Sequence, residues 1–349
     1  MAYATFNKPS LYFNTKLYTG TGSAQSITGV GFQPDWVWGK NRATTNYHDL
    51  EDSSRGVTKR LSTNASDVEA TETVNFTAFD SDGFTVGTGA NVNGNGNNIV
   101  VWNWKANAGT TSSNSDGSIT STVQVNTNAG FSIVQWSGTT NATVGHGLGV
   151  KPDMVITKSR NNATNWATWH KDLTGGDEED RYVNLNTNAA DDTYTNYWGT
   201  GGFTSSVFGV SNNAFHNNIG NMVAYCFASK KGYSKFGGYT GNENVDGTFV
   251  YTGFKPAWIL FKKVGGSSAA DWQLWDNKRD PFNPVEKAIH PNASGGASTD
   301  QDIDILSNGF KLRSSASHLN ANGVAFIYMA FAAEPLVANV GQGIPATAR

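Results

Sequence analysis

The sequence of 349 residues has one cysteine, few charged residues and no long apolar run. Cys226 therefore has no partner for an internal disulfide, and its apolar neighbours at 222–227 predict a small buried side chain rather than a nucleophile. No segment reaches the roughly 18 to 20 apolar residues of a membrane-spanning helix. Amphipathic helical patterns are also absent, and the N-terminus has no apolar secretory segment. These absences predict a protein that needs no oxidising compartment and does not insert into a membrane.

Charged residues make up 15% of the chain, and the formal net charge is −3. This balance argues against nucleic acid and against an anionic membrane surface as partners. The chain is rich instead in glycine, with 39 residues, and in aromatic residues, with 11 Trp, 12 Tyr and 19 Phe. Many turn formers beside many aromatic side chains are typical of β-sandwiches and β-barrels, so we expect an all-β fold.

One pattern occurs three times, at residues 31–42, 149–160 and 252–263. Each copy has a turn with Gly and Pro, then a short apolar run, then a basic end. Proline lacks an N–H and fixes φ, so it suits a turn or the first residue of a strand, and the apolar run after it predicts that strand. The copies lie about 105 to 120 residues apart, which is the size of a domain. We therefore predict three tandem β-sandwich-like domains related by an internal repeat.

Further landmarks recur in the same order in each copy. An aromatic residue followed by Ser or Thr and then Gly precedes each proline, at Tyr18, Trp136 and Tyr239. A phenylalanine follows each proline further along the chain, at Phe84, Phe208 and Phe310. The predicted divisions are an N-terminal arm at 1–15, repeat units at 16–106, 131–232 and 233–335, a linker or strand at 107–130, and a C-terminal tail at 336–349. The sequence leaves open whether the units stand apart like beads or share one core.

Residues of catalytic or metal-binding type form no complete motif. Residues 80–83 have the look of an acidic calcium loop but lack the remaining ligands, which favours a tight turn. The acidic run at 177–180 lies between glycines and a predicted strand, which favours a solvated loop. The histidines lack zinc spacing, and no Gly-x-Ser-x-Gly segment is present. We therefore assign no catalytic residue, no cofactor and no metal ligand.

The three copies do not share a carboxylate. Asp35 and Asp153 follow the prolines of the first two copies, whereas Ala257 stands in the third. A site needed in every unit would keep its carboxylate, so we interpret this Asp as a turn residue. The 28 Asp and Glu residues nevertheless offer many pairs, so a glycosidase with two carboxylates remains the alternative from a different class.

Aromatic residues after two of the proline strands form the candidate ligand or partner surface. They are Trp166, Trp169, His170, Trp272 and Trp275. Because side chains alternate along a strand, Trp272 and Trp275 point to opposite faces, and we expect at least one aromatic ring to face solvent. Aromatic faces beside Asn, Asp and Gly suit a sugar ring or a neighbouring subunit. Packing between strands within the sheet is the structural alternative.

Several segments resemble a known repeat. In the first unit these are WGKNRATTN at 38–46, SSRGVTKRLSTN at 53–64, FDSDGFTVG at 79–87 and VWNWKA at 101–106. In the later units they are VGHGLGVKP at 144–152, FGGYTG at 236–241, FVYTGF at 249–254, WDNKR at 275–279 and YMAFA at 328–332. Together they resemble the Trp/Gly-rich repeat domain of virion structural proteins of tailed bacteriophages, which are often labelled tail fibre or tail proteins. The resemblance extends over residues 16 to 335.

This resemblance implies a non-enzymatic protein of the virion surface, with a tail fibre or tail-associated protein that attaches to the host as the leading hypothesis. The implied partners are other virion proteins, further copies of the chain in a homo-oligomer, for which a trimer is the common guess, and host surface glycan. Assembly in the host bacterial cytoplasm fits the absence of a signal peptide and of disulfides. A capsid decoration protein is the alternative within this class. The resemblance supplies no catalytic residue.

Overall fold

The computed structural model describes residue 6 and residues 8–138, 141–212, 220–266, 268–299 and 302–336. Most of the predicted C-terminal tail, part of the N-terminal arm and His216 lie outside the described residues. The fold is all-β, which confirms the prediction from composition. In the described chain the helices are short: η1 (Pro9–Leu11), α1 (Ala90–Asn93) and α2 (Ser317–Asn320). None of them is long and apolar enough to cross a membrane.

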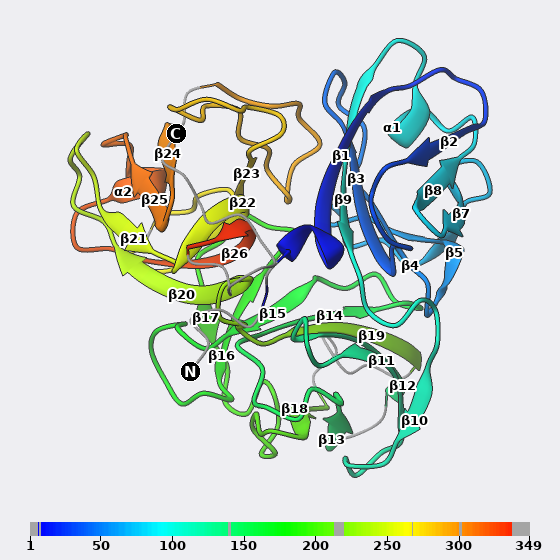
Figure 1. The fold of residues 1–349 in the computed structure, drawn as a ribbon. Coiled ribbons are helices and arrows are strands. Elements are labelled where there is room, and N and C mark those ends of the chain that lie inside the picture. The colour runs from blue at the N-terminus through cyan, green and yellow to red at the C-terminus, as the bar shows by residue number, and fades with distance from the viewer. Residues whose placement is uncertain are drawn as a thin grey trace.

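Three large antiparallel sheets form three lobes around a common centre (Figure 1). The first has the order β1 (Phe13–Thr19), β9 (Asn98–Trp104), β3 (Trp36–Asn41), β4 (Asp49–Asp52), β5 (Gly56–Leu61) and β6 (Ala70–Thr71). The second has the order β10 (Ser112–Asn114), β11 (Ser121–Asn126), β12 (Phe131–Gly138), β19 (Gly220–Phe227), β14 (Met154–Ser159), β15 (Ala167–His170), β16 (Arg181–Asn184) and β17 (Asp192–Thr193). The third has the order β20 (Ser234–Thr240), β26 (Ala325–Pro335), β22 (Phe254–Lys263) and β23 (Gln273–Asp276).

The same order of four strands occurs in each large sheet. The strand that opens the lobe pairs with the strand that ends it. That last strand also pairs with the strand at the proline, and the proline strand pairs with the strand that follows it in the chain. The three series are β1-β9-β3-β4, β12-β19-β14-β15 and β20-β26-β22-β23. Pro34 and Pro152 come just before β3 and β14, whereas Pro256 lies inside β22 where the register with β26 shifts. A bulge is a place where a strand tolerates a residue without an N–H.

Each large sheet is covered on one face by a small sheet of its own. The small sheets are β2 (Gln25–Thr28), β8 (Gly83–Val86) and β7 (Phe76–Asp80); β13 (Ala142–Gly145) and β18 (Val207–Val210); and β21 (Phe249–Tyr251), β25 (Gly309–Leu312) and β24 (Ile303–Leu306). A separate apolar cluster fills the space between the two sheets of each lobe. Each lobe is therefore a small sandwich.

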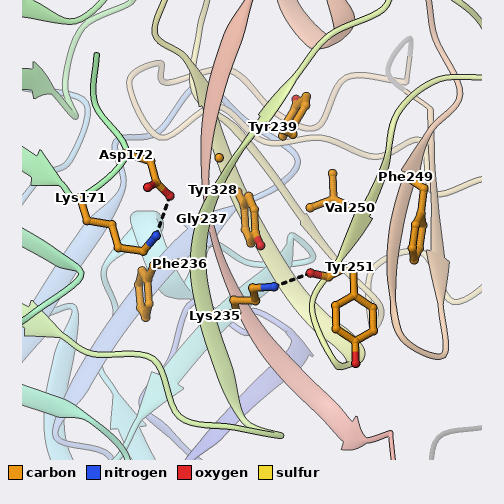
Figure 2. Close-up of a pocket in the computed structure, with 11 residues that line it drawn as sticks. Lys171, Asp172, Lys235, Phe236, Gly237, Tyr239, Phe249, Val250, Tyr251 and Tyr328 are labelled. Atoms are coloured by element: carbon orange, nitrogen blue, oxygen red, sulfur yellow. Dashed lines mark hydrogen bonds and ion pairs between the residues drawn. The ribbon is translucent and has the colours of Figure 1, made fainter. Parts of the chain in front are cut away.

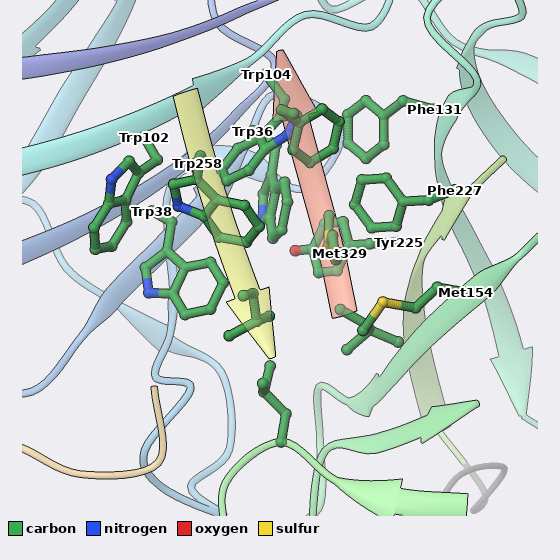
Figure 3. Close-up of a cluster of buried hydrophobic side chains, with 14 of the residues drawn as sticks. Trp36, Trp38, Trp102, Trp104, Phe131, Met154, Tyr225, Phe227, Trp258 and Met329 are labelled. Carbon is green, nitrogen blue, oxygen red and sulfur yellow. The ribbon is translucent and has the colours of Figure 1, made fainter. Parts of the chain in front are cut away.

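The opposite faces of the three large sheets meet in one shared aromatic core (Figure 3). Alternation along β3 explains the division, because Val37 points to the small sheet while Trp36 and Trp38 point to the shared core. Trp36 stacks on Tyr225 of the second lobe, with ring centroids 4.7 Å apart. Trp104 meets Trp258 of the third lobe edge to face at 5.5 Å. The three units therefore share a core, which answers the question that the sequence leaves open.

Hydrogen bonds between lobes involve residues at the same position in each of the three large sheets. Asp52, His170 and Asp276 stand opposite Trp36, Met154 and Trp258 in their sheets. Tyr225 of the second lobe donates its hydroxyl to Asp52 at 2.7 Å, and Trp102 of the first lobe donates its indole N–H to Asp276 at 3.0 Å. His170 Nε2 lies 3.2 Å from the carbonyl oxygen of Tyr328 in the third lobe. Each lobe is thus bonded to the next, and the series closes on itself.

A second set of hydrogen bonds starts at the residue directly before β4, β15 and β23. Trp166 donates its indole N–H to the Ser62 carbonyl at 2.9 Å, and Trp272 donates to the Asn184 carbonyl at 3.0 Å. In the first lobe, His48 takes this position, with Nε2 3.2 Å from the His290 carbonyl oxygen. Its Nδ1 accepts the Trp38 indole N–H at 2.9 Å, so the neutral ring donates through Nε2. These bonds also connect all three lobes in a cycle.

Candidate binding groove between the second and third lobes

The aromatic residues predicted to form a ligand surface are buried. No more than 1% of the surface of any of them is accessible: Trp166, Trp169, His170, Trp272 and Trp275. Trp169 stacks on Phe203 at 3.8 Å, and Trp275 packs against Phe261 at 4.6 Å. The expectation that one of these rings faces solvent is therefore wrong. The physical reason is that both faces of each large sheet are covered, so alternation along the strand offers no solvent-exposed face here.

The acidic segments have local structural roles. Residues 80–83 form the turn between β7 and β8, and the Asp82 carboxylate accepts the N–H groups of Gly29 and Gly31. In the acidic run, Glu178 pairs with Lys151 at 2.6 Å. Asp35 is more than a turn residue, because its buried carboxylate accepts N–H groups at residues 106, 108 and 109 and the amide of Gln124. The described residues contain no group of three His, Cys, Asp or Glu side chains placed to hold a metal ion.

Cys226 is a buried residue of β19, as its apolar neighbours predict. Burial raises the pKa of its thiol, which keeps the sulfur protonated and unreactive at neutral pH. The cysteine therefore gives no candidate nucleophile.

Three buried lysines occupy equivalent places at the basic ends of the proline strands. They are Lys40, Lys158 and Lys262. Their ammonium groups donate to backbone carbonyls, such as Asn46 at 2.7 Å for Lys40 and Asn188 at 2.9 Å for Lys262. Burial lowers the pKa of each of the three to about 8. Because their side chains have no access to solvent, these cations hold loops in place and are not part of a surface site.

Three fully buried carboxylates lie on β4 of the first lobe: Asp52, which accepts the Tyr225 hydroxyl, and the pair Asp49 and Glu51. Asp49 accepts hydrogen bonds from Arg60 and Asn91, whereas neither carboxylate oxygen of Glu51 has a hydrogen-bond partner among the described residues. Burial raises the pKa of Asp49 to about 6, and burial together with Asp49 raises the pKa of Glu51. Trp169 and Trp275 stand at the position of Glu51 in the other lobes. The acidic pair is thus particular to the first lobe and closed to solvent.

An open groove lies where the second lobe meets the third (Figure 2). Two adjoining cavities, of about 330 and 490 Å³, share Lys171, Lys235, Phe236 and Tyr251 in their walls. The turn after β15 forms one side, and strands β20 and β21 form the other. We call this feature the β20–β21 groove and define it by Lys171, Asp172, Lys231, Lys235, Phe249 and Tyr251.

Two glycines among the residues that line the groove let neighbouring side chains lie close to β20. Gly237 and Gly238 lie on β20, the edge strand of the third sheet. A Cβ atom on Gly237 would come within 2.7 Å of the Tyr328 hydroxyl oxygen, so only glycine lets this ring lie so close to the strand. The Tyr328 hydroxyl points toward the space beside Lys235 in Figure 2.

Two aromatic rings stand on one wall of the groove. Phe249 and Tyr251 are 43% and 47% exposed, whereas Val250 between them is buried in the core of the third lobe. Strand alternation places the two rings on the same outer face of β21. The turn that follows is fixed by the N–H groups of Thr252 and Gly253, which both donate to the Asn308 carbonyl. The rings are therefore presented by a short, anchored strand.

The charge of the groove is positive, with three lysines and one aspartate in its walls. Lys171 pairs with Asp172 at 2.7 Å, and both side chains are 36% exposed. Lys235 donates to the Tyr251 carbonyl at 2.7 Å, and its ammonium nitrogen lies 5.3 Å from the Tyr251 ring centroid. Burial, and then the positive charge of Lys171, lowers the pKa of Lys235. The two ammonium groups repel each other, which an anion bound between them would relieve.

Sequence reasoning assigned no binding role to these residues, although the segment 249–254 is among those that carry the resemblance. The signal was present in residues 249–251, where two aromatic residues flank one valine with the period of a strand. The lysines gave no such signal, because Lys171 and Lys235 lie 64 positions apart in different lobes. The two lysines come together only because the second lobe packs against the third in the folded chain.

Comparison with known families identifies the chain. Residues 8–335 match a family model described as a domain of unknown function, DUF7483. The chain belongs to the DUF7483 family. The match extends over nearly all of the described residues, so the three lobes and the groove all lie inside the DUF7483 domain. No curated protein and no solved structure matches the chain.

Proposed function

We propose that this chain is a non-enzymatic structural protein of the virion surface of a tailed phage, and that it attaches to host surface glycan through the β20–β21 groove. The observation that carries the attachment role is the pair of exposed rings, Phe249 and Tyr251, beside the Lys171 and Lys235 ammonium groups in one open groove. Rings with apolar faces next to strong hydrogen-bond donors suit a sugar, which has both apolar faces and polar edges. The virion location rests on the resemblance of the repeated segments to phage structural proteins.

The scaffold supports a structural role. A shared aromatic core and two cycles of hydrogen bonds between lobes hold the groove walls, which come from different lobes, in a fixed relation. A binding surface on such a scaffold loses little conformational entropy when a ligand binds. In this proposal the chain assembles with other virion proteins and with copies of itself, as a trimer, in the host bacterial cytoplasm.

A polysaccharide-degrading enzyme is the competing class. A glycosidase needs two carboxylates that reach the scissile bond. The buried Asp49 and Glu51 cannot reach a ligand, and Asp172 is the one carboxylate among the described residues that line the groove. Incubation of the purified protein with host envelope polysaccharide, followed by an assay for new reducing ends, tests this alternative. Release of reducing ends would contradict the non-enzymatic proposal.

Two experiments test the proposed role. Antibody-gold labelling of intact particles is expected to mark the tail, and label confined to the capsid shell would instead favour a capsid decoration protein. Purified protein is expected to compete with phage for adsorption to host cells. The Tyr251→Ala variant should compete less well, while Phe282→Ala, which removes a 78% exposed ring outside the groove, should compete like the unmodified protein. Equal competition by all three proteins would exclude the groove as the attachment surface.

A further inference from the structure

We propose that the β20–β21 groove binds a saccharide that carries carboxylate groups, with the carboxylate held between Lys171 and Lys235 and the sugar ring against Tyr251. The inference rests on the proposed function for its biological setting, but the binding chemistry stands on the groove itself. It specifies the class of glycan, an acidic polysaccharide rich in uronic acid or a similar sugar.

The net positive charge of the groove favours an anionic ligand. The whole chain has a net charge of −3, yet the groove gathers three lysines against one aspartate. Asp172 neutralises Lys171 in part, whereas Lys235 donates to the neutral Tyr251 carbonyl, and the two lysines repel each other. A carboxylate between the two ammonium groups would gain charge-assisted hydrogen bonds at a partly desolvated site.

The aromatic wall distinguishes a sugar from other anions. A phosphate ion or an acidic peptide uses only the lysines, whereas a pyranose ring also covers the exposed faces of Phe249 and Tyr251. The two rings are two residues apart on one strand face, about 7 Å along the strand. The groove is also open at the surface, so a sugar within a long chain can enter from the side without threading.

Binding to a defined oligosaccharide tests the proposal. The probe is hexagalacturonate, and its fully methyl-esterified form, which has the same rings without charge, is the matched ligand. Isothermal titration calorimetry of the purified full-length chain is expected to show binding of the acid form, at least about tenfold tighter than the ester and weaker at higher salt. A glutamate hexapeptide, which has the charge without the rings, should bind more weakly than hexagalacturonate.

Four variants separate the contributions. Lys171→Gln and Lys235→Gln should each weaken binding of hexagalacturonate by about tenfold, while Lys287→Gln, an exposed lysine outside the groove, should not change it. Asp172→Asn should strengthen binding, because it removes the competing carboxylate from Lys171. An increase in affinity cannot be produced by loss of folding, so this variant keeps the test informative if a lysine variant is unstable.

The outcomes distinguish this inference from the proposed function. Equal binding of the acid and the ester, or an unchanged affinity in Lys171→Gln, Lys235→Gln and Asp172→Asn, overturns the inference whatever the virion location is. Equal binding of the glutamate peptide and the oligosaccharide overturns the part that assigns a sugar. Selective binding of hexagalacturonate together with absence of label on the virion would keep the inference and remove the proposed function.

Discussion

At the scale of single residues, the burial of three lysines is an electrostatic cost of this fold. Burial lowers the pKa of Lys40, Lys158 and Lys262 to about 8, well under that of a lysine in water. Between pH 8 and about 10.4 the unfolded chain therefore binds more protons than the folded chain at these positions. Stability contributed through these groups rises with pH in that window, because the cost of burying a charge disappears as the lysines lose their protons.

Lys262→Met makes this a measurable prediction. Methionine removes the titrating group while filling a similar volume, so the variant loses the pH dependence that belongs to Lys262. We expect the unfolding free energy of the unmodified protein to gain about 1 to 2 kcal/mol relative to the variant between pH 7.5 and 9.5. Urea unfolding at the two pH values measures it, with Lys287→Met at an exposed site as control. A difference between the two proteins that stays constant with pH would contradict the shifted pKa.

At the scale of elements, the contacts between lobes depend on side chains at equivalent strand positions. Trp166 comes just before β15, and its indole N–H reaches the Ser62 carbonyl of the first lobe. Trp258 on β22 lies in the same shared core, but its indole N–H has no hydrogen-bond partner among the described residues. The two residues are therefore a matched pair, because both are fully buried and only one of them makes a bond between lobes.

Trp166→Phe and Trp258→Phe should differ in stability for this reason. Both variants lose ring volume and create a small cavity. Trp166→Phe also leaves the Ser62 carbonyl without this donor, whereas Trp258→Phe removes an unpaired buried N–H group. We expect Trp166→Phe to be less stable than Trp258→Phe by about 1 to 3 kcal/mol in urea unfolding. Equal loss in the two variants would show that the bond between lobes adds no net stability.

The strands were more predictable than their surroundings. The Gly and Pro turn and the apolar run that follows it predict β3, β14 and β22, because turn chemistry and apolar patterning are local properties. The burial of Trp275 was not predictable in this way, since Tyr251 has the same aromatic character and is exposed. What differs is the position of the strand: β23 lies in a sheet covered on both faces, whereas β21 lies at the edge of a small outer sheet. That distinction depends on which sheets pack against each strand, which no local pattern encodes.

At the scale of the whole molecule, one chain closes a ring of three lobes around its own core. The core joins residues from all three lobes, such as Trp36, Tyr225 and Trp258 (Figure 3). A homotrimer is therefore not needed to complete this core, and any oligomer in the proposed virion assembly would use the outer surfaces. The shared core also makes each lobe depend on the other two, which has a direct thermodynamic consequence.

The three lobes should unfold together in one transition. Separate domains joined by linkers unfold independently, but here the loss of one lobe would expose Trp36, Trp104, Trp258 and their neighbours to water. We expect differential scanning calorimetry to show one peak, with a van't Hoff enthalpy close to the calorimetric enthalpy. A fragment of residues 233–336 should fail to fold alone, because its part of the shared core, including Trp258 and Phe331, would face solvent. Two or more resolved peaks, or a folded fragment with dispersed amide signals by NMR, would mean that the lobes keep their own stability and that the shared core is only a docking interface.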